Sequence, residues 1–260
     1  MIDLSGKVAI ITGAGSGVGR AASLLFARHG ASVCCLDIDE DGAATTAQEV
    51  VTSGGAAAWS RCDISSAEQV DAAVESSVAR FGRVDIMYNN AGIASAAVGR
   101  GKSFVEFGDG DIAKLVSVNF VGTIYGCRAA IARFLKQGGG GVIINTSSVA
   151  GLVGWGGVVY GATKGAVNQL TRGLAIEYAP NGIRVNSVCP AGMITNFGRL
   201  DGPRETPASE LEIETYGQLH PLGKPIAPED AAQAALFLAS DAAANITGVN
   251  LPVDGGYVAR

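Results

Sequence analysis

Short, continuously apolar segments alternate along the chain with longer segments in which apolar residues return every three or four positions. The first such pair covers residues 7–12, which we predict to be a strand, and residues 17–29, which we predict to be a helix. Gly30 is expected to end this helix in the left-handed conformation, ahead of a strand at 32–36. The pattern therefore predicts strands and helices that follow one another in turn.

The same unit returns later in the chain. Ser65 and Glu68 predict a capping box at the start of a helix that ends at Gly82, before a strand at 84–88. A further strand is expected at 183–188 and is apolar on both faces, as buried parallel strands are. Alternating strands and helices with right-handed crossovers predict an α/β fold, a doubly wound, Rossmann-like parallel β-sheet of about seven strands with helices on both faces, in three layers.

No linker or shift of composition divides the 260 residues, so a single domain is expected over residues 1–260. Residues 195–228 differ from the rest because they are rich in glycine, proline and charge. We predict that this segment is a mobile lid over a substrate site.

Composition and charge argue against several classes of function. The net charge of −5 and the pI near 5.1 disfavour nucleic acid as a partner. No run of apolar residues reaches the roughly 18 that a bilayer span requires, so no membrane span is expected. The five cysteines have no metal-ligand spacing, which predicts buried, reduced thiols of a cytoplasmic protein and no metal site.

A glycine-rich turn, Thr-Gly-Ala-Gly-Ser-Gly-Val-Gly, occupies residues 12–19 between the first strand and the first helix. Glycines permit a tight turn and a close backbone approach, and the amides and positive dipole at a helix N-terminus bind phosphate groups. The spacing is G-x-x-x-G-x-G, with Val18 where the commoner G-x-G-x-x-G pattern has its third glycine. We expect a dinucleotide pyrophosphate to contact Gly13, Gly15, Ser16, Gly17, Val18 and Gly19.

Asp37 is expected at the end of the second strand, 20 residues after Gly17. A carboxylate at this place accepts hydrogen bonds from the adenosine ribose and repels a 2′-phosphate. Neither residues 14–18 nor residues 38–41 contain an arginine or lysine that could bind that phosphate. The sequence therefore favours NAD(H) over NADP(H) as the cofactor, with Ile38 as a further contact.

Tyr160 and Lys164 lie four positions apart, and on a helix such positions share one face. A phenol in water has a pKa of ~10, which is too high for proton exchange at neutral pH. A fixed ammonium nearby favours the phenolate and lowers the pKa of the phenol. We therefore expect Tyr160 to act as a general acid and base whose pKa is lowered by Lys164.

These motifs and several others resemble, in the same order, those of the short-chain dehydrogenases/reductases in their short, single-domain, NAD-dependent form. The resemblance extends over essentially the whole chain. The segments that carry it are the glycine turn, Cys62-Asp63-Ile64, Asn89-Asn90-Ala91-Gly92, Asn119, and residues 147–151, 160–164, 190–195 and 253–256. The resemblance implies one dinucleotide-binding and catalytic domain with cofactor contacts also at Asp63, Ile64, Asn90, Ala91, Gly92, Tyr160, Lys164, Pro190, Gly192, Met193 and Thr195.

The resemblance also implies a role for each catalytic residue. Tyr160 would exchange a proton with the substrate oxygen while hydride passes between the substrate carbon and the nicotinamide C4. Lys164 would lower the pKa of Tyr160 and bind the nicotinamide ribose, and Asn119 would hold a water that links Lys164 to solvent. Ser148 would orient and polarise the substrate carbonyl.

Two departures from the family pattern lie close to these residues. In relatives the catalytic serine usually precedes the tyrosine by 13 residues, which gives Ser147, whereas the local S-x-A-G pattern gives Ser148. Neighbouring strand residues point to opposite faces, so we expect the register after the strand to decide, and we predict Ser148 with Ser147 as the alternative. Ala191 stands where relatives usually have glycine, and its methyl group is expected to be tolerated beside the nicotinamide.

The expected substrate pocket is mostly apolar. We expect its walls to come from Ala94, Ser95, Trp155, Val158, Val159, Phe197 and Tyr216. Trp155 and Phe197 are predicted substrate contacts together with Ser148 and Tyr160, which favours a hydrophobic or cyclic secondary alcohol or ketone as the small-molecule partner. The resemblance further implies a homo-oligomer, a tetramer or a dimer, in which residues 253–256 often take part.

Two other functions stay open at this point. An NADPH-dependent 3-oxoacyl-carrier-protein or CoA thioester reductase is disfavoured by Asp37 and by the lack of docking arginines near Gly139 and Asn181. A catalytically silent NAD-binding scaffold or sensor is disfavoured because the asparagine, serine, tyrosine and lysine are all present. The same residues serve oxidation and reduction, so the direction of the reaction in the cell does not follow from them.

Overall fold

Seven parallel strands form the central sheet in the order β3-β2-β1-β4-β5-β6-β7, within the residues that the structure, a computed structural model, describes: 2–99, 101–195, 197 and 209–260. The strands are β1 (Val8–Thr12), β2 (Ser32–Asp37), β3 (Ala56–Arg61), β4 (Ile86–Asn89), β5 (Gly141–Thr146), β6 (Ile183–Pro190) and β7 (Asn250–Val253). The chain adds strands to one side of β1 and then, from β4 onward, to the other side. Such a reversal leaves a crevice at the carboxyl ends of the strands, where ligands bind in this class of fold.

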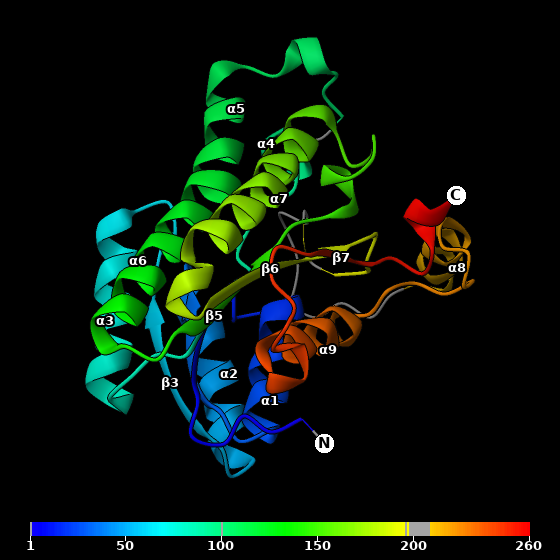
Figure 1. Ribbon diagram of the computed structural model, residues 1–260. Helices are drawn as coiled ribbons and strands as arrows, with labels where there is room; N and C mark the ends of the chain where they lie inside the picture. Colours follow the sequence, from blue (N-terminus) through cyan, green and yellow to red (C-terminus); the bar gives the residue numbers. More distant parts are fainter. Residues whose placement is uncertain (1, 100, 196, 198–208) are drawn as a thin grey trace.

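Helices cover both faces of the sheet (Figure 1). Their bounds are α1 (Gly17–Arg28), α2 (Glu40–Thr52), α3 (Ala67–Phe81), α4 (Ala96–Gly99), α5 (Asp109–Val116), α6 (Gly122–Gln137), α7 (Val158–Tyr178), α8 (Glu210–Leu219) and α9 (Pro228–Ala239). One core cluster joins the sheet to α1, α2 and α9, and a second joins its opposite face to α3, α6 and α7. This three-layer arrangement confirms the predicted doubly wound fold.

The inner strands of the sheet, such as β1, are apolar on both faces because each face meets a different core. In β1, Ala9 and Ile11 belong to the cluster of α1 and α9, whereas Val8 and Ile10 belong to the cluster of α3 and α6. All five residues of β1 are buried. Successive side chains of a strand point to opposite faces, so a strand that is covered on both faces must be apolar throughout.

Glycines end two of the helices in the left-handed conformation, as predicted. Gly30, which follows α1, has a φ of 92°, and Gly82, at the end of α3, has a φ of 82°. An L side chain rarely adopts such angles, so these positions favour glycine. The helix ends are therefore marked in the sequence itself.

The capping box predicted at Ser65 and Glu68 is wrong by one residue. Ser66 is the N-cap of α3, and its hydroxyl accepts a hydrogen bond from the Gln69 N–H at 3.3 Å. Ser65 instead donates its hydroxyl to Oδ1 of Asp63 at 2.6 Å. The carboxylate of Asp63 thus binds the first serine and leaves the second to cap the helix.

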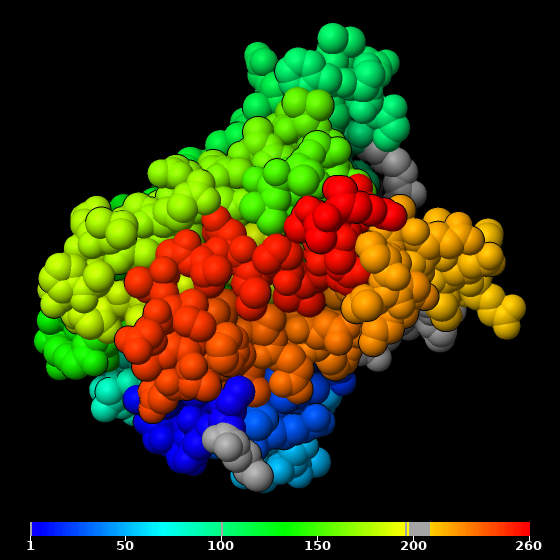
Figure 2. All heavy atoms as spheres, turned by 45° about the vertical axis from the view of Figure 1, so that its right-hand side comes forward, coloured from blue at the N-terminus to red at the C-terminus, as the bar shows by residue number. Residues whose placement is uncertain are grey.

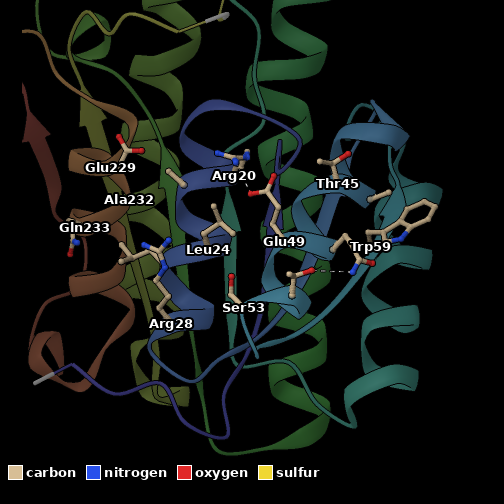
Figure 3. A pocket seen from close by; sticks show the side chains of 15 residues that line it. Arg20, Leu24, Arg28, Thr45, Glu49, Ser53, Trp59, Glu229, Ala232 and Gln233 are labelled. Atoms are coloured by element: carbon tan, nitrogen blue, oxygen red, sulfur yellow. Dashed lines mark hydrogen bonds and ion pairs between the residues drawn. The ribbon is translucent and has the colours of Figure 1, made fainter. Parts of the chain in front are cut away.

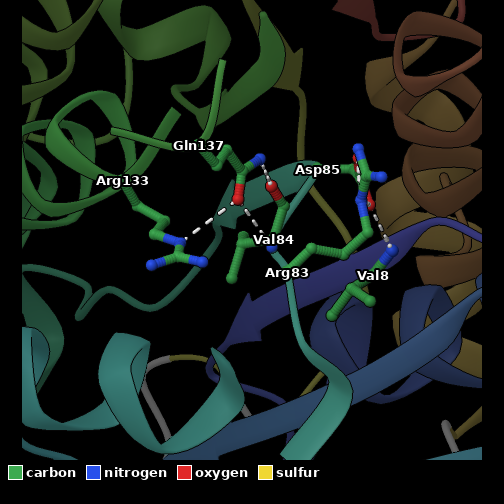
Figure 4. A network of polar contacts seen from close by, with 6 residues as sticks. All are labelled: Val8, Arg83, Val84, Asp85, Arg133 and Gln137. Carbon is green, nitrogen blue, oxygen red and sulfur yellow. Dashed lines mark hydrogen bonds and ion pairs between the residues drawn. The ribbon is translucent and has the colours of Figure 1, made fainter. Parts of the chain in front are cut away.

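Side chains close the amino-terminal edge of the sheet (Figure 4). The buried carboxylate of Asp85 accepts a hydrogen bond from the Val8 N–H at 2.9 Å and pairs with the Arg83 guanidinium at 2.6 Å. Gln137, the last residue of α6, accepts a hydrogen bond from the Val84 N–H and donates one to the Val84 carbonyl. The polar groups at this edge are thus bonded to one another, and the opposite edge carries the crevice.

The longest helical segment, Asp109–Gln137, combines α5, the π-helical turn Ser117–Val121 and α6. Among the described residues, this segment alone is long and apolar enough to cross a membrane, with a mean hydropathy of 1.4. However, 56% of its most apolar window is buried inside the molecule, where α6 packs against α3 and β4. Such packing is typical of a core helix.

All five cysteines are buried and form no disulfide, as predicted. Burial raises the pKa of Cys34 to about 11 and that of Cys35 to about 12, which keeps both thiols protonated and unreactive. In the part of the chain that the structure describes, no group of His, Cys, Asp and Glu side chains could hold a metal ion.

Gly126→Ala tests the contact between α6 and the sheet. A Cβ here would lie 1.9 Å from Oδ1 of Asn89, a buried amide that is bonded to Asn145. We expect the free energy of unfolding to fall by about 1–3 kcal/mol, because helix and strand must move apart. Gly173→Ala on α7, where a Cβ meets no atom within 4 Å, is the matched control and should raise this free energy by about 0.5–1 kcal/mol. Urea unfolding followed by circular dichroism measures both, and equal effects would contradict the packing argument.

Candidate active site

One cavity of about 640 Å³ lies at the carboxyl ends of the central strands. The predicted site residues that line it are Gly13, Ser16, Gly17, Val18, Asp37, Ile38, Asp63, Ile64, Asn90, Ala91, Gly92, Ser148, Trp155, Tyr160, Lys164, Pro190, Gly192, Met193, Thr195 and Phe197. Three predicted residues do not line it and are buried: Gly15, Gly19 and Asn119. The structure thus brings the predicted cofactor and catalytic residues together in one cavity.

The glycine turn needs glycine for two physical reasons. Gly13 has a φ of 66°, and a Cβ there would lie 2.9 Å from Cα of Ala91, while a Cβ at Gly19 would lie 2.0 Å from the Gly13 carbonyl oxygen. Gly17, the first residue of α1, has a φ of 50°, and the atom nearest to its Cβ would be Cγ2 of Thr195 at 4.0 Å. The turn therefore leaves an open cradle at the N-terminus of α1, which fits the pyrophosphate of a dinucleotide.

Asp37 lies beside this cradle at the end of β2. Its Oδ2 accepts a hydrogen bond from the Gly15 N–H at 2.8 Å, and its Oδ1 accepts one from the Asp39 N–H at 2.9 Å. These backbone bonds hold the carboxylate next to Ile38, which also lines the cavity and is 55% exposed. The free lone pairs of the carboxylate can accept hydrogen bonds from ribose hydroxyls.

Tyr160 and Lys164 lie on the first two turns of α7, and both are buried. The Nζ of Lys164 lies 5.7 Å from the centroid of the Tyr160 ring. The same Nζ donates a hydrogen bond to the carbonyl of Thr146 at 2.8 Å. Thr146 is the last residue of β5, so the sheet itself holds the ammonium in place.

Burial moves the pKa values of this pair in opposite directions. It raises the pKa of Tyr160 to about 12, although a hydrogen bond with Ser148 acts against the rise and Cys189 adds to it. Burial lowers the pKa of Lys164 to about 8. The prediction that Lys164 holds the pKa of Tyr160 below its usual value is wrong for this structure, because the loss of hydration outweighs the interactions that favour the phenolate.

Ser147 and Ser148 contact different partners, as expected for neighbours at the end of a strand. Ser148 donates a hydrogen bond to the Pro190 carbonyl at 3.3 Å and accepts one from the Ala150 N–H at 3.1 Å, and its hydroxyl acts to lower the pKa of Tyr160. Ser147 donates to the backbone carbonyl of Lys164 at 3.0 Å. Both serines line the cavity, but only the Ser148 hydroxyl is among the groups that affect the pKa of Tyr160.

Asn119 lies in the π-helical turn and is completely buried. Its amide donates to the Ile93 carbonyl at 2.9 Å and accepts a hydrogen bond from the Ile93 N–H at 2.8 Å. A Cβ at Gly92 would lie 3.1 Å from Oδ1 of Asn119 and 3.6 Å from Nζ of Lys164. Asn119 therefore positions the segment after β4, in which Gly92 lies next to the ammonium, and π-turns of this kind often occur at functional sites.

The side chains expected to wall the substrate pocket divide between two cavities. Trp155 and Phe197 line the main cavity, and the ring of Phe197 lies edge-on to Tyr160 with 6.1 Å between the centroids. Val158 and Val159 line a separate cavity of about 280 Å³. The expectation that these valines wall the main pocket is wrong, because α7 begins at Val158 and its first turn directs them away from the face of Tyr160.

The predicted lid at 195–228 lies in part outside the described residues, at 196 and 198–208. Its described part contains α8, on which Tyr216 lines the cavity. Met193 and Ile226 form an isolated parallel bridge across the two ends of this segment.

A larger cavity of about 920 Å³ lies among α1, α2 and α9 (Figure 3). Arg20, Arg28, Trp59 and Glu229 are among the residues that line it, and Arg20 pairs with Glu49 at 2.6 Å. None of the predicted catalytic or cofactor residues within the described chain lines this cavity. The size of a cavity therefore does not identify the candidate active site. The chemistry of the residues that line the cavity identifies it.

Comparison with known proteins agrees with this geometry. The family model described as "Enoyl-(Acyl carrier protein) reductase" matches residues 13–258, nearly the whole chain. The chain belongs to the short-chain dehydrogenases/reductases. This family uses nicotinamide cofactors, in agreement with the cradle at the start of α1.

This short-chain dehydrogenase/reductase is 41% identical to 3beta-hydroxysteroid dehydrogenase 1 of Eggerthella lenta over 258 residues, 98% of the chain and 94% of the relative. It is 41% identical to 2,5-dichloro-2,5-cyclohexadiene-1,4-diol dehydrogenase of Sphingobium indicum over 263 residues, 100% of both proteins. The crystal structure of carveol dehydrogenase from Mycobacterium avium in complex with NAD is similar, with a TM-score of 0.90 and 30% identity over 100% of both chains. These relatives are named as dehydrogenases, which supports an oxidoreductase.

Sequence reasoning missed two groups in this site. Lys114, on α5, lines the cavity, and its charge acts with the hydroxyl of Ser65, the stronger influence, to hold the pKa of Asp63 below its usual range. Thr146 acts through its backbone carbonyl, which receives the ammonium of Lys164. Every residue has a backbone carbonyl, so no sequence motif marks the one of Thr146. Lys114 reaches the cavity through the packing of α5, which no motif predicts.

The lowered pKa of Lys164 predicts stability that rises with pH. Its folded pKa is about 8 and its ordinary value 10.5, so between these values the unfolded chain binds more protons than the folded protein. The contribution of Lys164 to the free energy of unfolding is complete above the pKa of the unfolded chain. It is lost as the pH falls from that value through the pKa of the folded protein. Wild type should gain up to about 3 kcal/mol in free energy of unfolding over Lys164→Met between about pH 7.5 and pH 10.5.

Urea unfolding at the two pH values measures this difference. Lys136→Met, which removes an exposed lysine of α6, is the matched control and should follow wild type at both. A constant gap between wild type and Lys164→Met would contradict the shifted pKa of Lys164.

Proposed function

We propose that the protein transfers a hydride between NAD(H) and a secondary alcohol or ketone that is hydrophobic or cyclic, with Tyr160 as the general acid and base. The observation that carries the proposal is the single cavity that extends from the glycine turn and Asp37 to Ser148 and Tyr160. The names of the relatives, which refer to a hydroxysteroid, a cyclohexadienediol and carveol, support a ring-bearing alcohol.

The chain's own residues would bind the substrate oxygen and move its proton. The Ser148 hydroxyl would hydrogen-bond the carbonyl oxygen and hold it beside the phenol of Tyr160. Oη of Tyr160 would donate the proton in reduction and accept it in oxidation, while Lys164 and Asn119 connect the site to a proton supply. NAD, when bound along the glycine turn, supplies the hydride acceptor at nicotinamide C4, and its reduced form supplies the donor.

The state of Tyr160 affects the two directions differently. Because burial raises its pKa to about 12, the phenol is protonated at neutral pH and is ready to donate to a ketone oxygen. Alcohol oxidation needs the phenolate, so its rate should rise as the solution becomes more alkaline. The proposal covers both directions, since the same groups serve each.

The pocket beside Tyr160 supports an apolar substrate. Trp155, Phe197 and Tyr216 contribute aromatic walls, and Met193 adds a further apolar side chain to the lining. Pockets lined in this way bind ligands through apolar contact and use a few polar groups for orientation. Ser148 and Tyr160 are the polar groups that would orient a secondary alcohol.

We further propose that the protein is cytoplasmic and forms a homo-oligomer, a tetramer or a dimer, with neither nucleic acid nor membrane as a partner. The buried free thiols support a cytoplasmic location, and the net charge of −5 argues against nucleic acid as a partner. Members of this family commonly form oligomers, which supports a homo-oligomer.

Ser148→Ala and Ser147→Ala form a matched pair that tests the catalytic assignment. On the best substrate from a panel of secondary alcohols assayed by NADH formation, Ser148→Ala should lower kcat by about 10²-fold or more, and Ser147→Ala by less than about tenfold. Tyr160→Phe should lower kcat by about 10³-fold or more and leave NADH affinity within about threefold. Equal losses in the two serine variants would contradict the assignment, and turnover by Tyr160→Phe at the wild-type rate would contradict the proposed mechanism.

Fluorescence titration with NADH and NADPH tests the role of Asp37. NADH should bind at least about tenfold more tightly, because the carboxylate repels a 2′-phosphate. Asp37→Asn keeps the shape and removes the charge, so the preference should fall toward unity, whereas Asp41→Asn, which alters a carboxylate in the first turn of α2, should leave it unchanged. Tighter binding of NADPH to wild type would contradict the proposal and favour the thioester reductase.

A further inference from the structure

Residues 257–260 lie against two different walls of the substrate cavity, the turn that carries Trp155 and helix α8. They follow β7 and form the 3₁₀ turn Tyr257–Ala259. Figure 2 shows this segment in red, next to the green segment that precedes α7 and the orange atoms of α8. None of these residues lines the cavity itself.

Trp155 is supported from behind by Tyr257. Their rings meet edge-on, with 6.1 Å between the centroids and 64° between the planes. Trp155 also packs on a small apolar cluster built around Val149, Ala191 and Ile226. Because Trp155 lines the cavity and Tyr257 does not, the indole stands between the cavity and residues 257–260.

Arg260 joins Tyr257 to α8. Its guanidinium carbon lies 5.5 Å from the centroid of the Tyr257 ring, and its Nη2 donates a hydrogen bond to the carbonyl of Leu219 at 2.7 Å. Leu219 is the last residue of α8, where a positive charge is favoured by the helix dipole. The Tyr257 ring thus contacts both an indole and a guanidinium, groups that interact well with an aromatic ring.

Helix α8 in turn forms the second wall. Tyr216 lines the cavity, and a Cβ at Gly192 would lie 3.0 Å from the Tyr216 ring and 3.6 Å from Cδ1 of Leu219. The helix therefore rests on the segment after β6, close to the expected position of the nicotinamide. A shift of its last turn would move Tyr216 relative to Trp155.

The base of residues 257–260 is fixed to the sheet. The buried carboxylate of Asp254 accepts hydrogen bonds from the Gly256 N–H at 3.0 Å and from the Val258 N–H at 2.8 Å. The Leu222 N–H, just beyond α8, donates to the Gly255 carbonyl at 3.0 Å. These hydrogen bonds fix the start of residues 257–260, which in turn contact Trp155 and α8.

We propose that Tyr257 and Arg260 are specificity-determining positioning residues that set the separation of Trp155 and α8, and so the size of the ring that fits beside Tyr160. Neither residue touches the reacting atoms, and each acts through a cavity wall. This inference rests on the proposed function, because it assumes an alcohol or ketone substrate in that cavity.

Tyr257→Leu removes the supporting ring and keeps an apolar side chain. With a fused-ring secondary alcohol such as 2-decalol, KM should rise about tenfold, whereas KM for 2-butanol and kcat for both should stay within about threefold. Arg260→Gln should show the same split to a smaller extent, and Arg260→Lys should restore wild-type values because an ammonium can still donate to the Leu219 carbonyl. Phe81→Leu, which removes a ring that lies 5.2 Å from the Arg80 guanidinium on α3, is the matched control and should change neither KM.

Acrylamide quenching of Trp155 fluorescence gives a readout that needs no substrate. The chain has two tryptophans, so the measurement uses a Trp59→Phe background, in which Tyr257→Leu should increase quenching about twofold as the indole loses its neighbour. If wild type is active but Tyr257→Leu affects both alcohols equally or neither, the inference is overturned and the proposed function stands. If wild type oxidises no alcohol of the panel, the proposed function is overturned. The quenching measurement then decides the positioning role alone: increased quenching in Tyr257→Leu supports this role, and unchanged quenching overturns it.

Discussion

The buried ammonium of Lys164 is the constraint on which the rest of the site depends. Burial removes its hydration, and the carbonyl of Thr146 at the end of β5 replaces part of what is lost. This contact requires α7 to lie very close to the strand. Gly151 and Gly161 permit an equally close approach of α7 to the turn Val149–Gly151 that follows β5, because a Cβ at Gly151 would lie 2.6 Å from the carbonyl carbon of Lys164 and a Cβ at Gly161 would lie 2.8 Å from the carbonyl oxygen of Ala150.

Polar side chains in the core hold α7 at one register on the sheet. Asn145, in β5, accepts a hydrogen bond from the Asn89 amide at 2.9 Å and donates one to the hydroxyl of Thr171 at 3.0 Å. Asn168 donates to the carbonyl of Gly151 at 3.1 Å. A shift of the helix along the sheet would leave these buried groups unpaired, at about 1–3 kcal/mol each. The contacts that stabilise the fold are therefore also the ones that align Tyr160 and Lys164 with the end of β5.

Local signals explain what could be predicted from the sequence, and distant contacts explain what could not. The order of strands and helices, the glycine turn and the spacing of Tyr160 and Lys164 are properties of short segments, and the structure places them as expected. The pKa of Tyr160 depends on hydration, which segments from several parts of the chain remove together, so its direction was wrongly predicted. The choice of Ser66 as the cap of α3 depends on the Asp63 carboxylate, which the capping pattern does not include.

The two ends of the cavity rest on different parts of the fold. Tyr160 and Lys164 are held by β5 and α7, whose contacts are close and largely polar, whereas Trp155 and α8 are held by apolar packing and by residues 257–260. Changes in apolar packing are tolerated better than the loss of a partner from a buried charge. The wall formed by Trp155 and α8 can therefore vary in shape while Tyr160 and Lys164 keep their environment.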